Sequence, residues 1–278
     1  LGMRTATYRP GRSVLSMAVI ASAAFILIAV SAFRRDTTAS TDPHSGTGGY
    51  PLIVESLLPI VHHPNTPEGR EAVNLLNLGP AVKFEAFRLL AGDDASCLNL
   101  YEPRNPRIAA PSDRFLAAGR FAFQDPQAST PEEIANPWLL LNRTFDDGAI
   151  AAVADQTTLM YVLHLAVGDD FSFSPEGHPP VKLRIVGALA DSFLQSELII
   201  GEPAFVRLFP RHEGYRVWMI ESEPGRQAAV TTHLEDRLSD FGLDVSDTHE
   251  RWAAYHRVEN TYLATFQAVG SLGLLLGT

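Results

Sequence analysis

The sequence is poor in cysteine and in basic residues, and both shortages exclude classes of protein. Cys97 is the single cysteine, so the chain can form no intrachain disulfide and has no CxxC metal or redox pair. The 22 basic residues are outnumbered by 32 acidic residues. A net charge of −10 argues against a general nucleic-acid-binding protein, which needs a basic face to neutralise phosphates.

The motifs of several common enzyme classes are also missing. The 278 residues contain no GxxxxGK[ST] phosphate-binding loop, no HExxH zinc motif, no EF-hand loop and no GxSxG nucleophile elbow. We therefore expect no catalytic, cofactor-binding or metal-binding residues and no cofactor. With 46% hydrophobic and 19% charged residues, the chain is long enough to bury a large core and is not disordered.

An uncharged run near the N-terminus predicts a transmembrane helix over residues 13–33. These 21 residues would form a helix of roughly 30 Å, the thickness of the hydrocarbon core of a bilayer. A cleaved signal peptide is the alternative, because Val30, Ser31 and Ala32 resemble a cleavage site. The length of the run and the arginine pair 34–35 directly after it favour the uncleaved helix.

The last 18 residues, 261–278, also lack charge and predict a second, truncated transmembrane helix. Gly270, Gly273 and Gly277 fall in this run, and the last two form a GxxxG pair. Glycines at this spacing let helices approach closely in lipid, so we expect these three to pack membrane helices. The alternative is an amphipathic C-terminal helix in a soluble protein.

The charges outside these runs predict which side of the membrane each part occupies. Three arginines precede residue 13, and the remaining 19 basic and 32 acidic residues leave a net charge of −13 on the rest of the chain. The positive-inside rule then favours a cytoplasmic N-terminus and an exported region over residues 34–260. The chain is expected to be a fragment of a longer protein.

The exported region is predicted to be α+β. A polar linker covers 34–49, and a split β-α-β domain covers 50–96 and 214–247, around an inserted mixed α/β subdomain at 97–213. In the split domain we expect these elements: strands at 50–55, 81–89, 215–221 and 243–245, and helices at 66–78 and 224–241. Asp247 is expected to cap a long helix over 248–278 that enters the second membrane run.

Weaker constellations have simpler interpretations. His62 and His63 are adjacent, without an acid or cysteine at metal spacing, and are expected to be surface imidazoles of a loop. Cys97 lies in an apolar stretch and is expected to be a buried thiol.

A catalytic triad can also be drawn from scattered polar residues. It would combine Asp155 and His164 with Ser172 or Ser174. Asp155 is better interpreted as the N-cap of a following helix, and His164 as a partly buried partner.

Several stretches, in order along the chain, resemble the FtsX-like and MacB-like permease subunits of ABC transporters. They are YRPGRSVLSMAVIASAAFILIAVSAFRRD, GTGGYPLIVES, DDASCLNLYEPRNPRI, IVGALADSFLQSELIIGEPAFVRLFPRHEGYRVWMIE and YLATFQAVGSLGLLLGT. The resemblance implies a multi-pass protein of the bacterial inner membrane, with residues 34–260 periplasmic or extracellular as a porter-like domain with an inserted subdomain. It implies an ABC ATPase subunit or domain as partner, a homo- or hetero-dimer of permeases in contact with membrane lipid, and no nucleic acid.

The resemblance also implies a mechanism, in which ATP-driven motion reaches the exported domain for export or extraction of a substrate. The helix predicted from Asp247 suits this role, because 248–269 contains neither proline nor glycine and forms a stiff lever. Two other functions stay open: a membrane-anchored extracytoplasmic binding or sensor module, and a secreted enzyme with a signal peptide.

Overall fold

The computed structural model describes residues 10–33, 41–93, 103–175, 179–195 and 197–277. The chain divides into two compact units. The helical unit comprises Leu1–Thr38 and Ala253–Thr278, and the sheet unit comprises Ala39–Trp252. The boundary between the units falls inside helix α8, Thr248–Gly277, so this helix contributes to both.

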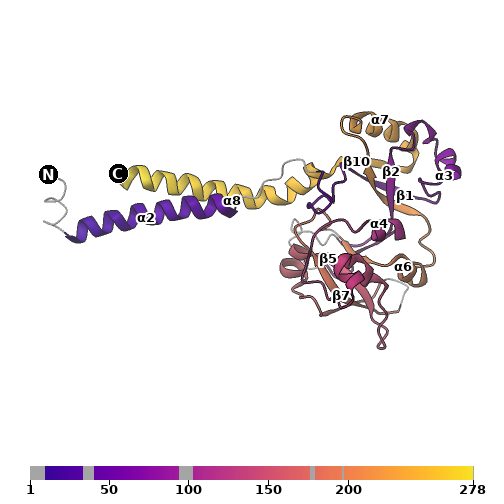
Figure 1. The fold of residues 1–278 in the computed structure, drawn as a ribbon, viewed down its shortest axis with the longest axis horizontal. Helices are drawn as coiled ribbons and strands as arrows, with labels where there is room; N and C mark the ends of the chain where they lie inside the picture. The colour runs from indigo at the N-terminus through magenta and orange to yellow at the C-terminus, as the bar shows by residue number, and fades with distance from the viewer. Residues whose placement is uncertain (1–9, 34–40, 94–102, 176–178, 196, 278) are drawn as a thin grey trace. The chain divides into compact units, whose positions relative to one another are not determined.

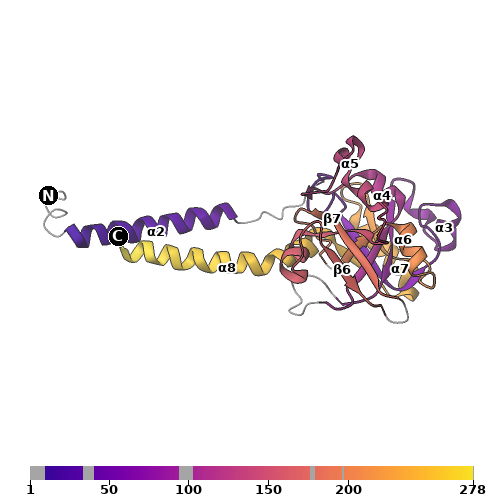
Figure 2. The ribbon, with the colours of Figure 1, turned by 90° about the horizontal axis from the view of Figure 1, so that it is seen from below.

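In the helical unit, helix α2, Pro10–Phe33, lies beside the second part of α8 (Figures 1 and 2). A methyl group on Gly270 would lie 3.6 Å from Ile26 and 3.7 Å from Leu27, which is ordinary van der Waals contact. Large apolar side chains are nevertheless exposed here, among them Phe25 and Phe266 at 72% and 59%. Within the described part of the chain, no helix is both long enough and apolar enough to cross a bilayer.

The sheet unit is built on one mixed ten-stranded sheet, with the order β10-β1-β9-β2-β3-β8-β5-β7-β4 and with β6 also paired to β7. The strands are β1 Leu52–Ile60, β2 Lys83–Leu90, β3 Arg107–Pro111, β4 Phe123–Gln124, β5 Ile150–Asp155, β6 Asp170–Phe173, β7 Val181–Leu189, β8 Glu197–Ile200, β9 Tyr215–Glu221 and β10 Leu243–Asp247. A mixed α/β fold is therefore confirmed.

The first four strands of this order form two interleaved β-α-β units. Strand β9 pairs antiparallel with both β1 and β2, and β1 pairs antiparallel with both β9 and β10. Helix α3, Pro67–Ala72, connects β1 to β2, and helix α7, Gln227–Leu238, connects β9 to β10. This is the split βαβ arrangement of ferredoxin-like folds. The chain leaves it after β2 and returns at β9.

The chain between β2 and β9 forms the other half of the sheet, from β3 to β4 in the strand order. Strand β3 pairs parallel with β8, β8 antiparallel with β5, and β5 parallel with β7, while β4 and β6 both pair antiparallel with β7. The helices of this part are short: α4 Asp113–Ala118, α5 Pro131–Ala135 and α6 Glu202–Leu208. The division of the exported region into an outer domain and an inserted subdomain stays a prediction, since Ala39–Trp252 forms one compact unit.

Two hydrophobic clusters hold the sheet unit together. One joins β1, β2 and β9 to α7 and includes Val54, Trp218 and Leu234. The other joins β3, β5, β7 and β8 to α6 and includes Leu183 and Phe205. Each of these side chains is at most 1% exposed, and burying one contributes about 1.5–3 kcal/mol before the entropic costs of folding.

Several predicted elements differ in extent. Thr66 caps α3 as predicted, with its side chain accepting a 3.0 Å bond from Gly69 N, but the helix ends at Ala72 and a 3₁₀ turn follows at Leu76–Leu78. The interruption coincides with Asn74, whose φ is +55°, and it turns Leu75 fully into the core. The helix expected after Asp155 is present over residues 156–163, of which Thr158–Leu163 is π-helical, and Asp155 itself ends β5.

Candidate functional site at the root of helix α8

The first turn of α8, here called the helix root, is fixed to the sheet unit by hydrogen bonds. Asp247 caps the helix as predicted, since its Oδ1 accepts bonds from His249 N at 2.7 Å and from Glu250 N at 3.1 Å. Thr248 is completely buried; its N–H donates to the Pro51 carbonyl at 3.1 Å and its hydroxyl to the Tyr50 carbonyl. The root is therefore bonded to the chain just before β1.

Trp252 adds a packing contact to the root. Its side chain is 8% exposed and lies against Gly46, where a β-carbon would come within 2.6 Å of the indole ring. The indole N–H lies 3.4 Å from Asp191 Oδ1. The ring packs within the sheet unit. Gly46 is small because the indole occupies the space of a side chain.

A series of connected ion pairs extends from the root across the sheet. Arg251 of α8 is paired with Glu55 of β1 at 2.5 Å, and the second oxygen of Glu55 lies 3.0 Å from Arg107 of β3. Arg107 in turn lies 3.3 Å from Glu197 of β8. We call these four residues the root network. Its members come from both halves of the strand order, so the network joins α8 to the ferredoxin-like strands and to the strands beyond β2.

The root network is partly shielded from water. Side-chain exposure falls from 29% at Glu55 to 18% at Arg107 and 6% at Glu197. Burial by itself would raise the pKa of Glu55, but the guanidinium groups of Arg251 and Arg107 outweigh it and hold that pKa below its usual value. Burial likewise opposes the charge of Arg107, and the two carboxylates overcome this and raise its pKa. Glu55 and Arg107 are therefore both charged at neutral pH.

Sequence reasoning did not find the root network. Glu55 and Arg107 are single charges within or beside apolar stretches, and that anomaly was the available signal, since buried charges are normally paired. Their partners could not be identified, because Glu55 and Arg251 are 196 positions apart and meet only through the strand order.

The three predicted glycines all belong to α8. Gly270 contacts α2 and lines a groove between the two helices together with residues that include Ser22 and Ala23. Gly273 and Gly277 lie in the helix, but their surroundings are outside the described residues. The packing of membrane helices by these glycines stays a prediction.

The two histidines lie in the loop after β1, as expected. His62 is exposed. His63 is half-buried, and its ring meets that of Tyr215 edge-on at 5.2 Å. Among the described residues, no three His, Cys, Asp or Glu side chains are grouped so that they could hold a metal ion. Cys97 lies outside the described residues.

The triad drawn from Asp155, His164 and a serine is not assembled in the described part of the chain. Asp155 is fully buried and its Oδ2 accepts bonds from Ser192, from N at 2.7 Å and from Oγ at 3.0 Å. Its Oδ1 accepts from Thr157 N at 2.8 Å, so its local capping role is confirmed. His164, Ser172 and Ser174 are exposed, so the expectation that His164 is partly buried is wrong. Asp155 thus closes the loop around Ser192 and is a structural residue.

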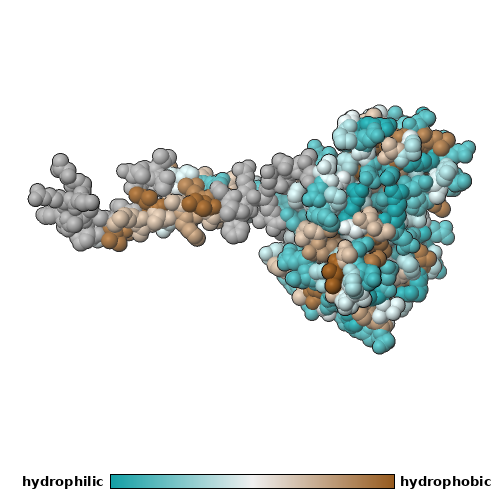
Figure 3. Space-filling model, in the orientation of Figure 1, coloured by the Kyte–Doolittle hydropathy of each residue, from teal (hydrophilic) through white to brown (hydrophobic). Residues whose placement is uncertain are grey.

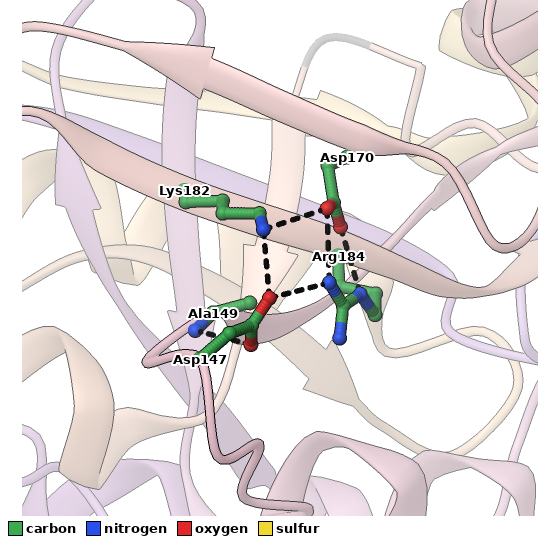
Figure 4. A network of polar contacts seen from close by, with 5 residues as sticks. All are labelled: Asp147, Ala149, Asp170, Lys182 and Arg184. Carbon is green, nitrogen blue, oxygen red and sulfur yellow. Dashed lines mark hydrogen bonds and ion pairs between the residues drawn. The ribbon is translucent and has the colours of Figure 1, made fainter.

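A second charged cluster lies at the surface, on β6, β7 and the loop before β5 (Figure 4). Lys182 and Arg184 project from β7 and are each paired with both Asp147 and Asp170, at 2.7–2.9 Å. Hydrogen bonds from the two cations lower the pKa of Asp170 to about 2. The cluster pins the β6 edge to the Asp147 loop.

Comparisons with known proteins find matches among solved structures. No family model and no curated protein matches the sequence. The periplasmic region of MacB from Actinobacillus actinomycetemcomitans is 9% identical, with a TM-score of 0.39 over 77% of this chain and 95% of that chain. The extracellular domain of the noncanonic ABC-type transporter YknZ from Gram-positive bacteria is 12% identical, with a TM-score of 0.37 over 70% of this chain and 98% of that chain. Similarity at this level assigns neither a family nor a function to the chain.

Proposed function

We propose that the chain is part of an ABC transporter permease of the FtsX-like and MacB-like kind, which passes ATP-driven motion to its exported sheet unit. The root network carries this proposal. A displacement of α8 at Arg251 acts on Glu55, Arg107 and Glu197 through charge-assisted bonds, and so on β1, β3 and β8 together.

The mechanical part of the proposal follows from stiffness. Packed cores and helices move as rigid elements rather than deforming continuously. Trp252 holds the first turn of α8 by packing, and Thr248 holds it by hydrogen bonds to the backbone. The turn therefore cannot slide along the strands without breaking these contacts. Motion of the helix is then expressed as motion of strands, which is what export or extraction of a substrate outside the membrane requires.

The membrane part of the proposal rests on the sequence and on exposed apolar surface. Residues 13–33 and 261–278 lack charge, and the helical unit exposes large apolar side chains on both of its helices (Figure 3). Lipid would cover that surface. We infer a multi-pass protein of the bacterial inner membrane with residues 34–260 outside the cytoplasm, in which Gly270, Gly273 and Gly277 pack membrane helices. We further infer that it forms homo- or hetero-dimers of permeases.

The chain itself has no enzymatic role in this proposal, since ATP is hydrolysed by a separate subunit or domain. The exported part comprises a porter-like domain at 50–96 and 214–247 and an inserted subdomain at 97–213. The two hydrophobic clusters support this division. The cluster that includes Trp218 is formed by the porter-like domain, and the cluster that includes Leu183 is formed by the inserted subdomain.

Labelling of single cysteines in intact cells tests the membrane arrangement. With Cys97 replaced by alanine, a cysteine in place of exposed Glu71 should react with an impermeant maleimide, whereas a cysteine in place of Thr7 should react only after lysis. Equal labelling of both positions, or recovery of the chain from the aqueous fraction without detergent, would contradict the arrangement.

A membrane-anchored binding or sensor module is the second candidate, and a pocket of about 370 Å³ lined by Arg88, Tyr215 and Val206 favours it. Co-purification separates the two functions. A permease should co-purify with an ATPase, whereas a sensor should co-purify with a signalling domain or without a partner.

A further inference from the structure

A second pocket, of about 400 Å³, is lined by strands β4 and β7, by the π-helical segment and by the loop that follows it. Most of its wall is apolar. Leu159 and Ala188 are 3% and 4% exposed, Leu165 and Val167 are half-buried, and Met160 is exposed. A hollow of this size falls within the range of small-molecule sites, roughly 300–1,000 Å³, and its apolar side chains can bury the apolar part of a bound molecule.

The polar part of the wall consists of Gln124, Asp125 and Gln156. Among the described residues that line the pocket, Asp125 is the one with a charged side chain. Its carboxylate makes no hydrogen bond and no ion pair within the described part of the chain, and neither carboxamide makes a hydrogen bond there. The wall therefore presents one negative charge and two carboxamide oxygens that are free to accept hydrogen bonds.

The backbone holds Asp125 in place from both sides. Gln124 pairs with Ala188 between β4 and β7, and Gln127 N donates to the Val186 carbonyl at 2.9 Å. Asp125 itself has a φ of +48°, in the left-handed region that aspartate and asparagine adopt more readily than most side chains. The carboxylate is thus attached to a constrained segment, so a ligand need not order that segment on binding.

The cations of the surface cluster on β7 do not neutralise the charge at this pocket. Lys182 and Arg184 flank Leu183, and successive side chains of a strand point to opposite faces. Leu183 belongs to the same hydrophobic cluster as Leu159 and Ala188, which line the pocket. Both cations are also already paired with the two aspartates of the surface cluster. The charge at the pocket is therefore uncompensated and attracts a cation rather than an anion.

We propose that this pocket binds a small organic ammonium ion with an apolar body. The ammonium donates to the Asp125 carboxylate and to the side-chain oxygens of Gln124 and Gln156. The apolar body covers Leu159 and Met160. A primary ammonium matches this wall better than a quaternary one, because its three N–H groups can each reach an acceptor. The inference does not depend on the proposed transporter function.

Calorimetric titration of the full chain in phosphatidylcholine nanodiscs tests this site, with the heat from empty nanodiscs subtracted. 2-Phenylethylammonium should bind. The uncharged 2-phenylethanol and the anionic 3-phenylpropionate should each bind about fivefold more weakly or worse, because they lack the charge that pairs with the carboxylate. Ethylammonium, which lacks the apolar body, should bind about tenfold more weakly or worse.

Two variants locate the binding. Asp125→Asn removes the charge and keeps a residue that tolerates left-handed backbone, so it should abolish the preference for the ammonium over the alcohol. Ala166→Trp fills the pocket from an exposed position and should weaken binding of the ammonium about tenfold or more. Asp236→Asn and Ala117→Trp, at exposed positions outside the pocket, are the matched controls and should bind as the parent does.

Four results would overturn the proposal. They are no binding of 2-phenylethylammonium, binding of the alcohol or of ethylammonium as tight as that of 2-phenylethylammonium, an unchanged preference for the ammonium in Asp125→Asn, and full binding by the Ala166→Trp variant with the Tm of the parent.

Discussion

Glu55 is the residue at which the root of α8 and the strands of the sheet meet, because each of its carboxylate oxygens binds a different arginine. Its partners come from α8 and β3, so this one side chain links two elements that are far apart in the sequence. Breaking such a pair is costly, because a partly buried charge remains without its partner.

We expect Glu55→Gln to lower the free energy of unfolding by about 1–3 kcal/mol at neutral pH. Because the pKa of Glu55 is lowered in the folded state, its stabilising contribution is present above the unfolded pKa of about 4.3 and is lost as pH falls through the folded pKa. The difference between parent and variant in chemical denaturation should therefore shrink below about pH 4. A difference that is constant with pH would show that the charge of Glu55 is not what stabilises the root.

Gly46 offers a second test of the root. A β-carbon there would lie 2.3 Å from the Asp191 carbonyl oxygen and 2.6 Å from Trp252, so Gly46→Ala should displace the indole. We expect a loss of about 1–3 kcal/mol in stability and a red shift of Trp252 fluorescence, measured with Trp138 and Trp218 replaced by phenylalanine in both proteins being compared. Gly11→Ala, which meets nothing within 4 Å, is the control and should change neither quantity.

At the scale of elements, α8 is the part whose continuity matters. Proline removes a helical hydrogen bond and bends the helix. In the assembled transporter, Ala264→Pro should abolish stimulation of the ATPase by substrate while the sheet unit stays folded, as judged by an unchanged Tm of its transition. Ala264→Leu keeps the helix and should keep the stimulation, whereas normal coupling in the proline variant would exclude α8 as a lever.

The surface cluster on β6 and β7 should respond to salt. Arg184→Met removes one of the two cations shared by Asp147 and Asp170, so Tm should fall slightly in dilute buffer. In roughly 1 M sodium chloride, where the screening length is about 3 Å, parent and variant should unfold together. A salt-independent difference would indicate that packing of Arg184 over Phe145 dominates.

Sequence reasoning recovered elements more fully than sites. The boundaries of β9 and the first residue of α8 were predicted correctly, because apolar runs, turn residues and caps are local signals. The pairing of β2 with β3 and the root network were not predicted, since they depend on which strands become neighbours across the sheet. Helix α3 was predicted too long. The chain leaves the helix after Ala72, and this turn places Leu75 in the core.

At the scale of the whole molecule, the proposal describes a folded body on one side of a membrane whose strands are moved through a single helix. The body contains a mixed sheet and two hydrophobic clusters. In the proposal, its motion is driven by a partner that hydrolyses ATP.

The most direct measurement is affinity purification of the tagged chain in mild detergent from cells that express it natively, followed by an ATPase assay of the eluate. We expect a vanadate-sensitive ATPase to elute with the chain at a fixed stoichiometry. An eluate in which the intact chain carries no ATPase, under conditions that preserve a known transporter complex, would contradict the account.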